Sequence, residues 1–114
     1  MKIRLKIASG IASAFLLLVC SAARADFNYE LAVWNIDNDV SGNCSYVYPP
    51  CWAQQYYGWA GYYVGLADYY GSRPCGEFTG GCDGPNSRSA AVGFSNAVAS
   101  YAFQEALNWA NFSS

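Results

Sequence analysis

The sequence contains no histidine, and beyond its first 25 residues it also contains no lysine. The only basic side chains after that point are Arg73 and Arg88. Nucleophilic catalysis by serine or cysteine needs a neighbouring base, most often histidine or lysine. Both kinds of base are missing, so carboxylates are the only acid–base groups that the chain offers. We therefore expect a protein that is not an enzyme and needs no cofactor.

Positive charge is also scarce. All of the 8 acidic side chains lie after residue 25, where two arginines leave a net charge of −6. A phosphate backbone repels such a chain, because binding to nucleic acid depends on lysine and arginine contacts. Anionic lipid repels it in the same way. The charge balance predicts no nucleic-acid partner.

Long hydrophobic runs are missing except near the N-terminus. Ile11–Val19 is apolar, but it is shorter than the roughly 20 residues that span a bilayer. Three basic residues precede it, and Ala23-Arg24-Ala25 follows it as a small-x-small cleavage site. These features predict a signal peptide over residues 1–25, removed with Cys20, and a periplasmic or secreted protein that is not an integral membrane protein.

Residues 26–114 then form one small domain with cysteines at positions 44, 51, 75 and 82, which is typical of a disulfide-stabilised exported protein. A straight helix over 52–70 would hold its ends about 28 Å apart, whereas the chain from Tyr70 to Cys75 reaches at most ~17 Å. The local pairs Cys44–Cys51 and Cys75–Cys82 are therefore favoured, each stabilising by roughly 2–3 kcal/mol. A helix broken at its glycines would readmit the crossed and nested pairings.

Two segments have helical periodicity. In the first, about 51–70, large side chains recur at steps of four and three. They are Trp52, Tyr56, Trp59, Tyr63, Leu66 and Tyr70. The second runs from 88 to about 111, after Ser87 as its N-cap, and has a face rich in alanine. We expect it to lie against Gly58, Gly61 and Gly65 of the first helix, since glycine permits close backbone approach.

The segment 27–36 is ambiguous. Phe27, Tyr29, Leu31 and Val33 alternate as in a half-buried strand, although Asp26 would also serve as the N-cap of a helix. The alternation favours an extended or β segment. A loop is expected over 37–44, and a second short strand is possible over 45–48.

The expected loop resembles the first half of a calcium-binding loop, with Asp37, Asp39 and Ser41 before Gly42. The twelfth position, where a bidentate glutamate belongs, is Tyr48. An ordinary Asx turn is the simpler interpretation, and the pattern leaves calcium binding undecided. With no histidine, and with cysteines spaced too widely for a zinc knuckle, no metal site is expected. The fold class that follows is mainly α: a small disulfide-stabilised domain with two packed helices and a short N-terminal extended or β segment.

The clearest functional signal is the aromatic content, with 10 tyrosines and 4 tryptophans. Most should fill the core of so small a domain, but Tyr57, Tyr62 and Tyr69 lie off the main stripe of the first helix. Exposed tyrosine with few charges is typical of protein-binding surfaces. We therefore expect a non-catalytic binding module that uses these tyrosines to engage an envelope or extracellular protein, or a glycan.

Two alternatives remain. Glu77 and Glu105 are the carboxylate pair that a small glycan hydrolase would use. The tyrosine doublets separated by glycine would also suit a self-assembling structural protein of the envelope. The oligomeric state and the identity of the partner are left open by the sequence.

Overall fold

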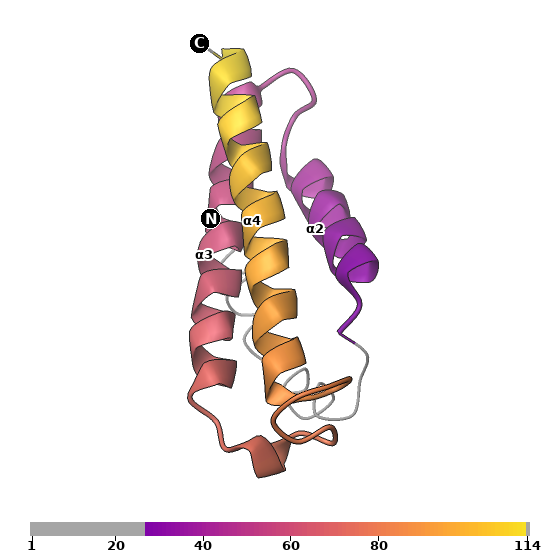
Figure 1. Cartoon of the computed structure of the whole chain (residues 1–114). Helices are drawn as coiled ribbons and strands as arrows, with labels where there is room; N and C mark the ends of the chain where they lie inside the picture. The colour runs from indigo at the N-terminus through magenta and orange to yellow at the C-terminus, as the bar shows by residue number, and fades with distance from the viewer. Residues whose placement is uncertain (1–26, 114) are drawn as a thin grey trace.

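The computed structural model describes residues 27–113 of the chain. The predicted signal peptide and its cleavage site lie outside these residues. The described part contains three α-helices, α2 (Tyr29–Asn43), α3 (Pro49–Gly71) and α4 (Arg88–Ser113), and a short 3-10 helix, η2 (Cys75–Glu77). Figure 1 shows α3 and α4 as long antiparallel neighbours, with the shorter α2 beside them. The prediction of a mainly α, disulfide-stabilised domain with two packed helices is confirmed.

Both long helices begin where the sequence predicts. Pro49 and Pro50 occupy the first positions of α3, where the backbone N–H groups that proline lacks would have no acceptor within the helix. Ser87 caps α4, since its Oγ accepts a hydrogen bond from the Ala90 amide at 3.1 Å. The disulfides Cys44–Cys51 and Cys75–Cys82 are the two local pairs that the geometric argument favoured.

The expected extended or β segment over 27–36 is wrong, because these residues enter α2. Asn28, not Asp26, is the N-cap: its Oδ1 accepts a hydrogen bond from the Leu31 amide at 2.9 Å. The buried side chains of α2 are Ala32, Ile36 and Val40, four residues apart, so the alternation of larger residues does not correspond to burial. Without a second strand in the described chain, an extended segment would leave its backbone groups unpaired.

The expected loop over 37–44 is also wrong, since α2 continues to Asn43. Val40 is completely buried and anchors this last part of the helix. Asn38 and Ser41, which favour turns, bond instead to backbone carbonyls one turn earlier in the same helix. The possible strand over 45–48 is a turn, in which the Tyr48 amide donates to the Ser45 carbonyl.

The core is centred between α3 and α4, with the buried residues of α2 packed against it, and it combines large residues with small ones. Figure 1 shows these two helices running side by side over most of their length. The buried residues of α3 include Tyr56, Tyr63, Leu66 and Tyr70. Those of α4 are Ala91, Ser95, Val98, Ala99, Ala102 and Ala106. The alanine face of α4 therefore receives the aromatic stripe of α3.

The predicted glycine seam is wrong. A Cβ atom added at Gly58, Gly61 or Gly65 would meet nothing within 4 Å, so no other backbone approaches this face of α3. The small residues that permit close packing are the alanines of α4. Gly80 is the position where glycine is needed, because a Cβ there would lie 1.9 Å from the Pro85 carbonyl oxygen.

These environments predict opposite effects for two alanine substitutions. Gly61→Ala should raise the free energy of unfolding by up to about 1 kcal/mol, since the helix gains propensity without a clash. Gly80→Ala should lower it by about 2 kcal/mol or more, because backbone atoms must move. Urea denaturation of both variants checks this, and destabilisation by Gly61→Ala would show that a close contact had been missed.

Candidate functional site

The loop between the first pair of cysteines exposes the most aromatic surface. Residues 44–51, here called the tip loop, comprise the turn between α2 and α3 and the first three residues of α3, at the end of the molecule where α4 finishes (Figure 1). The exposed fractions of Tyr46, Val47 and Tyr48 are 82%, 80% and 58%. Neither the tip loop nor the last turns of α4 carry a charged side chain.

The tip loop is held in place from several directions. The Cys44–Cys51 disulfide closes it, and the Trp52 indole N–H donates a hydrogen bond of 2.7 Å to the Ser45 carbonyl. Trp52 is itself stacked on Trp109 of α4, with ring centroids 4.6 Å apart. These contacts restrain the backbone that carries the exposed side chains, so binding would cost little conformational entropy of the loop. Sequence reasoning missed this surface, although two tyrosines inside a short cysteine loop were a visible signal.

The predicted binding residues Tyr57, Tyr62 and Tyr69 do not share one side of α3. Tyr57 is 64% exposed and lies against Phe103 of α4. Trp59 of α3 and Tyr101 of α4 face α2, because they bind Asp39 and Asp37. Tyr57 and Phe103 each lie two residues from one of these, and a two-residue step turns a helical side chain about 200° around the axis. Tyr57 and Phe103 therefore point away from α2.

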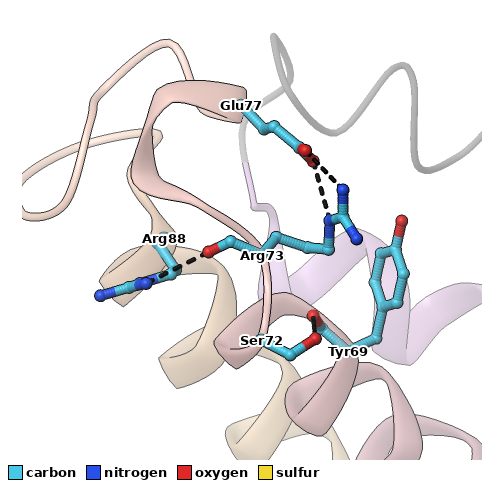
Figure 2. Close-up of polar contacts among 5 residues, drawn as sticks. All are labelled: Tyr69, Ser72, Arg73, Glu77 and Arg88. Atoms are coloured by element: carbon cyan, nitrogen blue, oxygen red, sulfur yellow. Dashed lines mark hydrogen bonds and ion pairs between the residues drawn. The ribbon is translucent and has the colours of Figure 1, made fainter.

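Tyr62 and Tyr69 lie seven residues apart, on a different side of α3 from Tyr57. Tyr62 is partly buried and packs edge-on against Trp59 and Tyr63. Burial raises the pKa of its phenol above the usual value. Tyr69 lies beneath the Arg73 guanidinium, 5.7 Å from the ring centroid (Figure 2). Binding by these three tyrosines stays a prediction, now divided between two sides of the helix.

One cluster of polar contacts joins all three α-helices. The Oδ1 atom of Asp37 in α2 accepts hydrogen bonds of 2.7 Å from the phenols of Tyr56 in α3 and Tyr101 in α4. The charge of Glu105, one turn after Tyr101, raises the pKa of both phenols, and the charge of Asp37 raises the pKa of Glu105. These four residues are here called the polar junction. Near it, Asp39 Oδ2 accepts a hydrogen bond of 2.9 Å from the Trp59 indole.

The environment of the polar junction shifts its ionisable groups toward their neutral forms. Burial, followed by the hydrogen bond to Asp37, raises the pKa of Tyr56 and of Tyr101. Burial raises the pKa of Glu105, and the Asp37 charge adds to the effect. Each cause disfavours an additional negative charge at a partly buried contact between helices.

The opposite end of the molecule holds both arginines of the described chain. Figure 2 shows Arg73 bound to Glu77 and the Arg88 side chain turned toward the Arg73 backbone. The Arg73 Nε–Glu77 Oε1 distance is 2.9 Å, and Arg88 Nη1 donates to the Arg73 carbonyl at 3.1 Å. The hydrogen bond from Arg73 holds the pKa of Glu77 below its usual value. Both cations are thus committed far from the polar junction.

The carboxylates nominated for glycan hydrolysis are not brought together. Glu77 lies beside the start of α4 through Arg73 and Arg88. Glu105 lies about 26 Å further along α4, at ~1.5 Å per helical residue. Paired glycosidase carboxylates are separated by only about 5–10 Å. This pair does not have the spacing that the mechanism needs.

The calcium-like pattern does not form a loop, since Asp37 and Asp39 are helical and bind aromatic side chains. Within residues 27–113, no group of three or more acidic or cysteine side chains is placed to hold a metal ion. No helix in that range is both long enough and apolar enough to cross a membrane. Comparison with protein-family models, with curated proteins and with solved structures found no match.

The polar junction predicts a measurable contribution from one phenol. Tyr101→Phe removes a hydrogen bond to a carboxylate and should lower the free energy of unfolding by about 1.5–3 kcal/mol. Tyr46→Phe is the matched control, because its hydroxyl lies on an exposed side chain, and it should change stability by less than about 0.5 kcal/mol. Equal effects of the two variants in urea denaturation would contradict the assignment.

Alkaline titration tests the buried phenols. Burial, with the charge of a neighbouring tyrosine, raises the pKa of both Tyr63 and Tyr70 to about 12. The folded state therefore keeps these protons where the unfolded chain loses them, near pH ~10, and stability falls as pH rises from there through 12. Phenolate absorbance of the folded protein should show a group of tyrosines that ionises at higher pH than the rest, and this separate transition should be absent in denaturant. One transition near pH ~10 in the folded protein would contradict this.

Proposed function

We propose that the protein is exported, with residues 1–25 removed, and acts without catalysis as a binding module for a protein of the envelope or the exterior. The observation that carries this proposal is the tip loop, a disulfide-closed segment that exposes Tyr46, Val47 and Tyr48 without a nearby charge. Tyrosine supplies large contact area at a low cost in side-chain entropy, and a held loop binds without first being ordered.

Two further features support export and binding. Both disulfides suit an oxidising compartment outside the cytoplasm. The exposed surface continues beside the tip loop at Phe112, which is 74% exposed and packs its ring edge against Trp109. The area is apolar, aromatic and uncharged, as the centre of a protein interface is. Tyr57, together with Phe103, is a second and smaller contact candidate.

Affinity capture from an envelope extract tests the proposal. Immobilised oxidised protein should retain a partner, and the double substitution Tyr46→Ser with Tyr48→Ser should weaken its affinity by about tenfold or more. Trp34→Ser is the matched control, because Trp34 is an exposed aromatic on the outer side of α2, and it should leave affinity unchanged. Tyr57→Ser and Tyr69→Ser test the surface predicted on α3.

The outcomes separate the functions considered. If Tyr57→Ser or Tyr69→Ser abolishes binding and the tip-loop substitutions do not, the contact surface lies on α3 and not on the tip loop. Retention of the partner by reduced and alkylated protein would indicate nonspecific adhesion and contradict the proposal. Oligomers that form with increasing concentration would favour self-assembly, and turnover of cell-wall glycans would favour hydrolysis.

A further inference from the structure

The polar junction contains two carboxylates and no basic side chain. Asp37 is stabilised by two phenol donors. Glu105 lies one helical turn after Tyr101, on the same face of α4, and its charge raises the pKa of both phenols. Within residues 27–113 no side chain donates a hydrogen bond to its carboxylate. The charged and titratable groups around it are Asp37 from α2, Tyr56 from α3 and Tyr101 from its own helix. Asp39, two residues after Asp37 in α2, is also acidic and accepts a hydrogen bond from the Trp59 indole.

Within residues 27–113, no basic side chain lies beside these acids. Arg73 follows the end of α3 and is bound to Glu77, whereas Arg88 opens α4 about 26 Å from Glu105 along the axis. Ionisation of both Asp37 and Glu105 therefore places two negative charges across the contact between α2 and α4. In partly buried surroundings such repulsion is screened less than on an exposed surface.

The attachment of α2 is modest in apolar contact. Only Ala32, Ile36 and Val40 of this helix are buried, and two of its outward residues, Leu31 and Trp34, are exposed. Its other contacts with the α3–α4 hairpin include the ring of Tyr29 against Tyr101 and the hydrogen bonds of Asp37 and Asp39, and the Cys44–Cys51 disulfide tethers its C-terminal end. Elements with few buried contacts are the ones that open locally at low free energy.

We propose that α2 is a proton-dependent cover over the α3–α4 hairpin. While Glu105 is neutral, Asp37 holds α2 closed through the two phenols. When Glu105 ionises, repulsion between its carboxylate and that of Asp37 loosens α2 and exposes Tyr56, Trp59 and Tyr101 beneath it. The device is separate from the tip loop and does not depend on what the tip loop binds.

The direction of the pH dependence follows from proton binding. With α2 docked, burial and the Asp37 charge raise the pKa of Glu105, so the closed state holds a proton that the open state releases. Closure is therefore strongest below the ordinary glutamate value and weakens as pH rises through the raised one. Acidification closes α2, and a rise toward neutral pH opens it.

Native-state hydrogen exchange of the oxidised protein, corrected for intrinsic rates, measures opening of α2 directly. Between about pH 4 and pH 7, the opening constant of α2 amides should rise severalfold, with a much smaller change in the centres of α3 and α4. Glu105→Gln should remove this rise and keep α2 closed at neutral pH. Glu30→Gln, which neutralises an exposed acid in the first turn of α2, should leave the rise intact.

A second variant covers the case in which Glu105→Gln does not fold. Asp37→Asn keeps an oxygen acceptor for the phenols and removes the charge that repels Glu105, so it too should flatten the pH dependence. A pH-independent opening constant in the unmodified protein overturns the proposal. So does a severalfold rise that persists in both neutral variants or disappears equally with Glu30→Gln.

Discussion

The structure depends on the packing of a large-residue face against a small-residue face. The aromatic side chains of α3, Tyr56, Tyr63 and Tyr70 among them, are buried against the alanines of α4. Alanine brings the two helix axes close enough for the rings to fill the space between them, and each ring buries much apolar area. This division of roles lets a domain with few aliphatic side chains form a core.

Helix α2 is attached to this pair in a different way. It buries three apolar side chains, Ala32, Ile36 and Val40. Polar contacts add to these, since one carboxylate oxygen accepts hydrogen bonds from donors on two other helices. A hydrogen bond to a charged acceptor is stronger than a neutral one. Among residues 27–113 this acceptor has no basic partner, so the contact between α2 and the hairpin carries an uncompensated negative charge.

The sequence was sufficient for the two long helices and for both disulfides, because each depends on local rules. Periodicity, Pro49-Pro50 and Ser87 mark the helices, and the limited reach of the chain selects the pairings. The N-terminal segment was predicted incorrectly because alternation among Phe27, Tyr29 and Leu31 described exposed and half-exposed positions. The residues that it buries are instead the apolar ones spaced one helical turn apart, Ala32, Ile36 and Val40.

The candidate sites were less accessible to sequence reasoning. The partners of Asp37 are 19 and 64 residues away in the chain, and nothing local pairs an aspartate with a particular distant tyrosine. The glycines were misread for a related reason, since an open position and a close-approach position look the same in sequence. Exposure of the tip loop depends on where the end of α4 lies, which only the assembled fold establishes.

Both disulfides join residues separated by 7 positions and lie at the connections between consecutive helices: Cys44–Cys51 links the C-cap of α2 to the start of α3, and Cys75–Cys82 lies between α3 and α4. Each bond therefore shortens a connection between consecutive helices and leaves the helix contacts to side-chain packing. Oxidation defines where the chain reverses direction, at opposite ends of the molecule. The disulfides thus constrain the two interhelical connections, whereas the packing of the helices along their length is determined by noncovalent contacts.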